Sequence, residues 1–201
     1  MSLVSCPRAT PVCLTPSTVC DSIGDTPLIL LREASARTGC TIFAKAEYLN
    51  PGGSIKDRIA RFMIIEAERR GDLRPGGTIL EVTSGNTGIG LSMVGAMRGY
   101  RVVIFLPKTV SAERRAMIRA YGAELRLLER LHDIHDAVGQ AIQMAREDAS
   151  IFLPSQFSNA DNPACPASTR RCGSSGSQFQ KRRSSCTSSG RSTTACPPSG
   201  T

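Results

Sequence analysis

The sequence predicts an α/β fold of three layers (αβα), in which a parallel β-sheet lies between helices. From residue 78 to residue 153, short apolar stretches alternate with amphipathic helical stretches, which is the pattern of β-α-β units with right-handed crossovers. Residues 102–106 are a continuous apolar run, as expected for a strand that is buried on both faces. Hydrophobic residues make up 40% of the 201 residues and aromatic residues only 4%, so the core must be aliphatic.

The first predicted elements are two strands and a helix. Residues 26–31 and 41–46 are short apolar stretches and are predicted as strands. A helical apolar stripe follows a Pro-Gly-Gly turn and ends at Gly71, a residue type that suits a helix C-terminus. Ser54 and Asp57 have the spacing of a capping box at the start of this helix. The stripe consists of Ile59, Phe62, Met63 and Ile65.

The remaining elements alternate between strand and helix. Small residues such as Gly90 and Gly95 indicate that one of these helices packs closely on a sheet. Ser111 is the predicted N-cap of the next helix, and Gly122 is its predicted end. The predicted order is strand 78–82, helix 86–97, strand 101–106, helix 111–121, strand 124–128, helix 133–149 and strand 151–153.

Both ends of the chain differ from the patterned body, which covers residues 21–163. Residues 1–20 are rich in Pro, Ser, Thr and Cys, and we expect them to form an irregular extension. Residues 164–201 contain no Leu, Ile, Val or Met, and they carry basic residues without an acidic one. Such a segment cannot bury enough apolar surface to offset its ordering entropy, so we expect a disordered, basic tail rich in Ser and Cys.

The charge and the cysteines argue against several classes of protein. The net charge is +8, but residues 1–163 are nearly neutral, which gives no electrostatic footprint for nucleic acid. No apolar run reaches the ~18 residues of a membrane span, so we expect a cytoplasmic protein. The eight cysteines form no C-x-x-C pair, which favours free thiols over a zinc site. His132 and His135 lack an evident third ligand, so a solvated helix start is favoured over a metal site.

Lys56 is the first candidate for chemistry. A single lysine near a helix start is usually a solvated surface residue. Here a Gly-Gly turn precedes the lysine and apolar residues follow it, so we expect partial burial. Burial lowers the pKa of an amine and makes it a nucleophile that can form a Schiff base with an aldehyde.

A second candidate is the polar, glycine-containing loop over residues 83–90. It follows a predicted strand and opens a predicted helix, so its backbone N–H groups can bind a carboxylate or a phosphate. The alternative is a tight turn whose glycines serve packing alone. The order of Gly85, Gly88 and Gly90 differs from the dinucleotide fingerprint, so NAD binding is disfavoured.

These two segments resemble the signature loops of the cysteine synthase and cystathionine β-synthase family, which are pyridoxal-phosphate enzymes of fold type II. Residues 50–60 are similar to the family's Asn-Pro-x-x-Ser-Val-Lys-Asp-Arg-Ile-Ala, and residues 81–90 to its Glu-Pro-Thr-Ser-Gly-Asn-Thr-Gly-Ile-Gly. Residues 23–28 and 156–163 fit two further segments of the family. The resemblance covers about residues 20–163, with the family's small domain at about residues 50–150.

The resemblance implies roles for individual residues. Lys56 would form the internal aldimine with pyridoxal phosphate and later move the substrate's α-proton, while Asn86 would bind the phenolic oxygen of the cofactor. The residues implied for the carboxylate of the amino-acid substrate are Thr83, Ser84, Gly85, Thr87 and Gln156. The implied reaction is β-replacement, in which O-acetylserine and sulfide give cysteine. Homocysteine as nucleophile, as in cystathionine β-synthase, is the related alternative. Family members are homodimers.

The resemblance stops near Pro163. The family continues with a Gly-x-Gly-Gly-Thr loop that binds the cofactor phosphate, and this segment is not found in the sequence. We therefore expect an incomplete second domain and weak or absent activity. The composition of residues 164–201 suggests the hypothesis of a reading-frame shift near residues 161–165. A non-catalytic remnant or interaction protein with a basic tail is the alternative from a different class.

Overall fold

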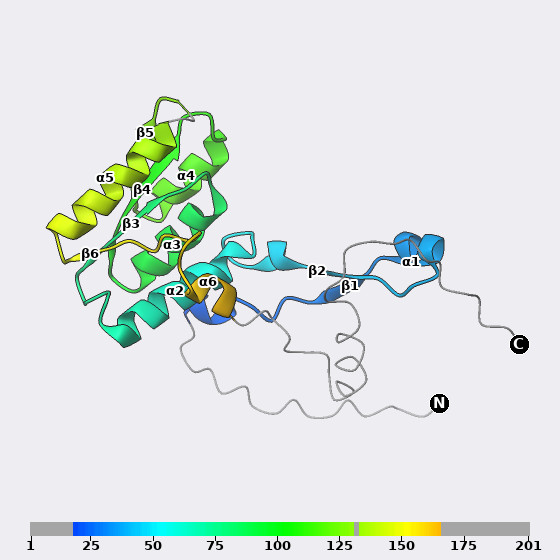
Figure 1. Ribbon diagram of the computed structural model, residues 1–201. Helices are drawn as coiled ribbons and strands as arrows, with labels where there is room; N and C mark the ends of the chain where they lie inside the picture. Colours follow the sequence, from blue (N-terminus) through cyan, green and yellow to red (C-terminus); the bar gives the residue numbers. More distant parts are fainter. Residues whose placement is uncertain (1–17, 131–132, 166–201) are drawn as a thin grey trace, which may run out of the picture. The chain divides into compact units, whose positions relative to one another are not determined.

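A computed structural model describes residues 18–130 and 133–165 (Figure 1). Within these residues, four strands form a sheet in the order β5-β4-β3-β6, and all neighbouring pairs are parallel. The strands are β3 (Thr78–Val82), β4 (Arg101–Pro107), β5 (Glu124–Leu128) and β6 (Ile151–Phe152). The predicted parallel sheet and its four strands are confirmed.

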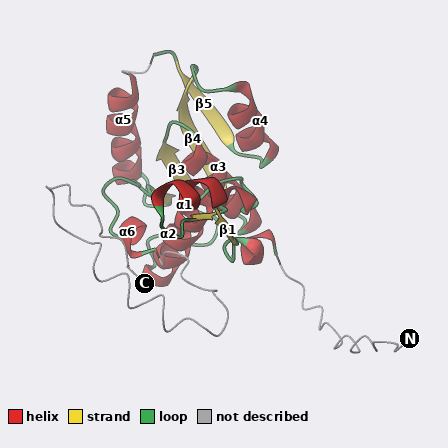
Figure 2. Ribbon diagram, turned by 90° about the vertical axis from the view of Figure 1, so that its right-hand side faces the viewer, coloured by secondary structure: helices red, strands yellow, loops and turns green. Residues whose placement is uncertain are grey.

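Helices cover both faces of this sheet, which confirms the three layers. On one face lie α2 (Lys56–Arg70), α3 (Asn86–Met97) and α4 (Ala112–Ala120), and on the other face lies α5 (Asp133–Glu147). Figure 2 shows α5 and α4 on opposite sides of the strands. Successive residues of a strand point to opposite faces. Accordingly, Ile79 packs in the core with α2 and α3, whereas its neighbour Leu80 packs with Ala137 and Ala141 of α5.

Helix α3 lies unusually close to its neighbours because of its glycines. A Cβ atom at Gly95 would lie 2.5 Å from Cγ2 of Val102 in β4. A Cβ atom at Gly90 would lie 3.1 Å from both the Cβ of Ala60 and the carbonyl oxygen of Lys56 in α2. The close packing predicted from these small residues is therefore confirmed.

The capping box predicted for α2 is wrong. The helix begins at Lys56, and its N-cap residue, Ile55, offers no capping side chain. The Asp57 carboxylate instead accepts a hydrogen bond from the backbone N–H of Gly52, at 2.6 Å. Ser54 accepts one from the backbone N–H of Lys56, at 3.1 Å. Ser111 occupies the N-cap position of α4, but its side chain makes no capping hydrogen bond.

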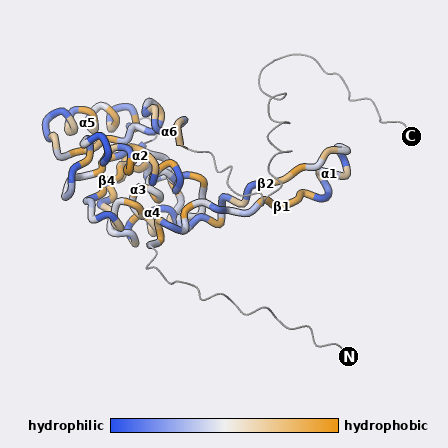
Figure 3. The backbone as a smooth tube through the Cα atoms, turned by 90° about the horizontal axis from the view of Figure 1, so that it is seen from below, coloured by the Kyte–Doolittle hydropathy of each residue, from blue (hydrophilic) through white to orange (hydrophobic). Residues whose placement is uncertain are grey.

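The two strands before α2 form an antiparallel ribbon that is separate from the parallel sheet. It consists of β1 (Leu28–Leu30) and β2 (Phe43–Lys45), and α1 (Arg32–Thr38) lies between them in the chain. Figure 3 shows hydrophobic stretches along the ribbon. Leu28 is 44% exposed and Phe43 is 40% exposed, so these side chains are not part of the core.

Four short helical segments among the described residues were not predicted. They are α1, the 3₁₀ turns η1 (Val19–Ser22) and η2 (Glu47–Leu49), and α6 (Asp161–Ala164). Cys20 of η1 lies in the core. The expected extension and tail otherwise fall on residues outside the described ones. No helix in the described ranges is long and apolar enough to cross a membrane.

The packing of α3 predicts the effect of an added methyl group. Gly95→Ala should lower the free energy of unfolding by about 2 kcal/mol. Alanine favours the helix more than glycine does, but the clash of its methyl group with Val102 outweighs this gain. Gly139→Ala is the matched control, since Gly139 lies in α5 and a Cβ there would meet nothing within 4 Å. This control should be neutral or stabilising. Urea denaturation of both variants checks the prediction, and equal stabilities would contradict it.

Candidate active site

The two loops singled out in the sequence lie against each other. Lys56 is the first residue of α2, and its backbone carbonyl packs against Gly90, which lies one helical turn after Asn86 in α3. The Lys56 side chain is half-buried, as expected. The absent side chain at Gly90 therefore allows the lysine to approach the start of α3.

The loop before Lys56 is held by a partly buried ion pair. The Arg58 guanidinium donates to the Glu47 carboxylate through Nε at 2.7 Å, and it also donates to the Thr26 hydroxyl at 3.1 Å. Asn50 donates to the same carboxylate at 2.8 Å and to the Ser54 carbonyl at 3.1 Å. These bonds join the segments 23–28 and 50–60 in one network.

The charge on Glu47 is essential to this network. Burial alone would raise the pKa of the Glu47 carboxyl, but hydrogen bonds from Arg58, Asn50 and Thr26 outweigh burial and lower the pKa to about 2. Glu47 is therefore ionised at neutral pH. A carboxylate that keeps its charge in a mostly buried position stabilises the loop only while its donors remain in place.

Asp57 fixes the turn before Lys56 through a hydrogen bond to the backbone. Its side chain is fully buried, and its Oδ1 atom has no hydrogen-bond partner among the described residues. Burial raises the pKa of this carboxyl. A Cβ atom at Gly52 would lie 2.9 Å from Cγ of Asp57, so glycine is needed at this position for the carboxylate to reach the backbone N–H.

Residues 83–85 connect the end of β3 to the start of α3, so the second half of the predicted loop forms the first turn of the helix. Thr83 is buried, and its hydroxyl accepts a hydrogen bond from the Gly85 N–H at 3.3 Å. Ser84 and Asn86 are exposed, so a ligand can reach their side chains. The first N–H groups of α3 have no partners within the helix, and they carry the positive end of its dipole. This end of α3 suits a carboxylate or another anion.

Gln156 joins this loop although it lies 69 residues further along the chain. The hydroxyl of Thr87 donates to Oε1 of Gln156 at 2.6 Å, and both side chains are buried. The carbonyl of Gln156 accepts a hydrogen bond from the Asn162 amide at 2.6 Å. The structure thus brings together Thr83, Thr87 and Gln156, three of the residues predicted to bind the substrate.

Glu81 is a buried acid beside these residues for which the sequence suggested no role. It lies in β3, is only 4% exposed, and accepts a hydrogen bond from the Val82 N–H at 3.0 Å. Burial raises the pKa of Glu81 from its usual 4.5 to about 7. The backbone N–H groups of Val82, Gln156 and Ser155 lower the pKa, but burial outweighs them.

The residues present fit the aldehyde and the phenolic oxygen of pyridoxal phosphate and the carboxylate of an amino-acid substrate. The described residues include no Gly-x-Gly-Gly-Thr loop for the cofactor phosphate. Lys56 supplies a half-buried amine, and Asn86 an exposed amide at the start of α3. Glycine at position 90 keeps the lysine and this helix start in contact.

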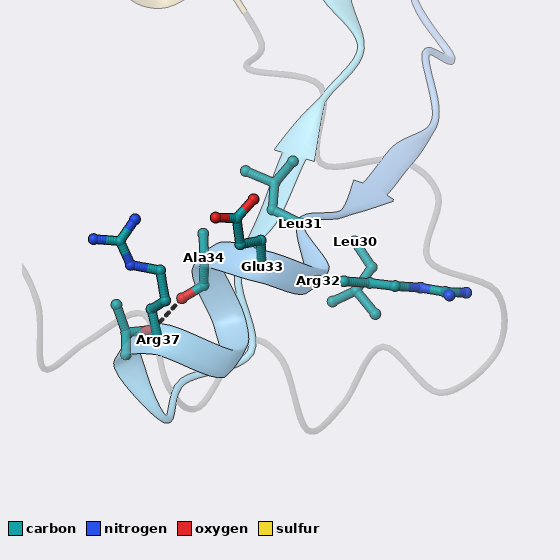
Figure 4. Close-up of a pocket in the computed structure, with 7 residues that line it drawn as sticks. Leu30, Leu31, Arg32, Glu33, Ala34 and Arg37 are labelled. Atoms are coloured by element: carbon teal, nitrogen blue, oxygen red, sulfur yellow. Dashed lines mark hydrogen bonds between the residues drawn. The ribbon is translucent and has the colours of Figure 1, made fainter.

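The other sequence candidates lie apart from this site. Cys20, Cys40 and Cys165 are free thiols, and the remaining cysteines are outside the described residues. His135 lies in α5, and His132 is not described. The described residues contain no group of three or more side chains that could hold a metal ion. A hollow of about 870 Å³ lies beside α1, lined by residues 30–34, 37 and 38 (Figure 4), and includes none of the predicted site residues.

Comparisons with known proteins match the same part of the chain. Residues 19–171 match the model of a family described as pyridoxal-phosphate dependent enzyme. Cysteine synthase B of Escherichia coli (strain K12) is 46% identical over 147 residues, which are 73% of this chain and 48% of that protein. Cysteine synthase of Staphylococcus aureus (strain Mu50) is 48% identical over 141 residues, 70% of this chain and 45% of that protein.

A solved structure shows the same similarity. The O-acetylserine dependent cystathionine β-synthase from Helicobacter pylori superposes with a TM-score of 0.69 and 34% identity, covering 76% of this chain and 50% of that one. The chain spans about half the length of the relatives it matches.

The raised pKa of Glu81 predicts a pH dependence of stability. Between pH 4.5 and about 7 the folded protein holds a proton on Glu81 that the unfolded chain releases. The contribution of Glu81 to the free energy of unfolding is therefore fully present below pH 4.5, and it is lost as the pH rises through about 7. The loss amounts to roughly 3 kcal/mol.

The variant Glu81→Gln should lack this part of the pH dependence. Urea denaturation over the same pH range should show the stability difference between the wild type and Glu81→Gln shrinking or reversing as the pH rises. Glu33→Gln, at an exposed position in α1, is the control and should follow the wild type. Parallel pH profiles for Glu81→Gln and the wild type would contradict the assignment.

Proposed function

Because the chain belongs to the pyridoxal-phosphate-dependent enzyme family, we propose that Lys56 binds pyridoxal phosphate and that the site performs a cysteine-synthase-like β-replacement on an amino acid. The observation that supports this proposal most strongly is the contact between the start of α2 and α3 at Gly90, which holds the lysine beside an anion-binding helix start. The cysteine synthases among the relatives support the reaction class.

The bound cofactor would serve as an electron sink for the substrate carbanion. Lys56 would hold the cofactor through Nζ and would move the proton of the substrate's Cα. The exposed amide of Asn86 would bind the phenolic oxygen of the cofactor.

The loop over residues 83–87 and Gln156 would bind the substrate carboxylate. The first N–H groups of α3 donate to the anion, the hydroxyls of Thr83 and Ser84 add further donors, and the hydroxyl of Thr87 orients the Gln156 side chain. The hydrogen bond between Thr87 and Gln156 fixes both side chains before the substrate arrives. A site that is ordered in advance loses less conformational entropy on binding.

We propose sulfide as the nucleophile, in a cytoplasmic homodimer that acts on O-acetylserine and contributes to cysteine biosynthesis. The similarity to the O-acetylserine dependent cystathionine β-synthase favours homocysteine as a second candidate. Product analysis with O-acetylserine and each nucleophile distinguishes the two, and sedimentation velocity tests the dimer.

Replacing the lysine tests the cofactor assignment. Pyridoxal phosphate should acquire the visible absorption band of a lysine adduct with the wild-type chain, and Lys56→Ala should lose this band. Lys108→Ala is the matched control, because Lys108 is exposed and pairs with Glu129 outside the site. Borohydride reduction followed by peptide mass analysis should place the label on Lys56. A full band in Lys56→Ala, or no band with the wild type, would refute the proposal for this chain.

Replacing Thr87 tests the carboxylate site. Thr87→Val should raise the O-acetylserine concentration that half-saturates the spectral change of the bound cofactor by about tenfold, because Gln156 loses the hydrogen bond that orients its side chain. Thr109→Val is the control, since Thr109 is exposed beyond β4, and it should leave half-saturation unchanged. Equal half-saturation in both variants would count against the assigned role.

A further inference from the structure

Glu81 and the loop that carries Gln156 are connected through the backbone. The Oε2 atom of Glu81 accepts a hydrogen bond from the Gln156 N–H at 3.4 Å, and its Oε1 atom accepts one from the N–H of Val82. Glu81 is only 4% exposed, so its carboxylate is shielded from solvent.

The conformation of Ser155 brings a third N–H group towards the same carboxyl. Ser155 has a φ of 48°, a left-handed value that it shares with only Asp25 among the described non-glycine residues. Its backbone N–H helps to lower the pKa of Glu81, and the N–H of the next residue, Gln156, donates to Glu81 at 3.4 Å. A left-handed residue in a turn can direct successive N–H groups to one anion. Such a conformation is costly for serine and persists only when the surroundings hold it.

Gln156 is therefore held at three points. Glu81 holds its N–H, Asn162 donates to its carbonyl, and Thr87 donates to its side chain. The Glu81 bond fixes the backbone from which the side chain extends. If this backbone moves, the Gln156 amide loses its position relative to Thr87.

We propose that Glu81 is a positioning residue that holds residues 154–158 in the conformation that presents the Gln156 side chain to Thr87. The consequence for substrate binding rests on the proposed function, whereas the anchoring of the loop does not. Glu81 acts through Gln156 and makes no contact with the substrate. A carboxyl group is needed at position 81 because its two oxygens accept hydrogen bonds from two different segments, the N–H of Val82 and the N–H of Gln156. A glutamine side chain offers only one acceptor oxygen.

Hydrogen exchange measured by mass spectrometry tests the anchoring without cofactor or substrate. In Glu81→Gln, the protection of the backbone amides over residues 154–158 should fall at least about tenfold, while that of β4 stays unchanged. Asp57→Asn is the matched control, because Asp57 is also a buried acid that accepts a backbone N–H. In this control the loss should fall on residues 50–55. Glu81→Asp serves as the second variant if Glu81→Gln does not fold.

The outcomes separate this inference from the proposed function. Unchanged protection over residues 154–158 overturns the anchoring, and an equal fall in every element shows a general loss of stability and overturns it too. With pyridoxal phosphate bound, Glu81→Gln should keep the lysine band and raise half-saturation by O-acetylserine about tenfold, as expected for the loss of an oriented hydrogen bond to a charged group. Loss of loop protection with unchanged half-saturation overturns the positioning role. Absence of the lysine band in the wild type refutes the proposed function and leaves the exchange result to decide the anchoring.

Discussion

The close approach of α3 to its neighbours is the constraint on which the candidate site depends. Gly95 allows the helix to lie on β4, and Gly90 allows α2 to pack against it at Lys56. Because cores are packed as tightly as organic crystals, one added methyl group would push these elements apart. The distance between the lysine and the start of α3 is thus set by residues that take no part in the chemistry.

Three carboxylates, two of them buried and one partly buried, hold the loops around this packed centre. Glu47 binds Arg58 and Asn50, Asp57 binds the Gly52 N–H, and Glu81 binds the Gln156 N–H. Each acid has lost much of its hydration and recovers part of that cost through backbone or side-chain donors. The three loops consequently have defined conformations although none lies in a regular strand or helix.

Local sequence patterns were enough to predict the four strands of the parallel sheet and the helices α2 to α5. The continuous apolar run of β4 matches its burial. The stripe predicted for α2 is only partly right, because Met63 is buried but Ile59, Phe62 and Ile65 are half-buried, and the buried face instead includes Ala60, Ile64 and Ala67. The capping box failed because the Gly52 N–H, which only a folded turn brings near, binds Asp57. The role of Glu81 could not be predicted either, because it depends on a backbone group 75 residues away. The short α1 buries none of its residues and so leaves no apolar signal.

The exposed apolar side chains of the β1–β2 ribbon have a consequence for the behaviour of the chain in solution. A ribbon of two strands is only marginally stable by itself, and open strand edges with apolar side chains favour pairing with other chains. Leu28, Ile29 and Leu30 are all roughly two-fifths exposed. Concentrated preparations of the chain should therefore begin to aggregate at this ribbon, with the helical layers still folded.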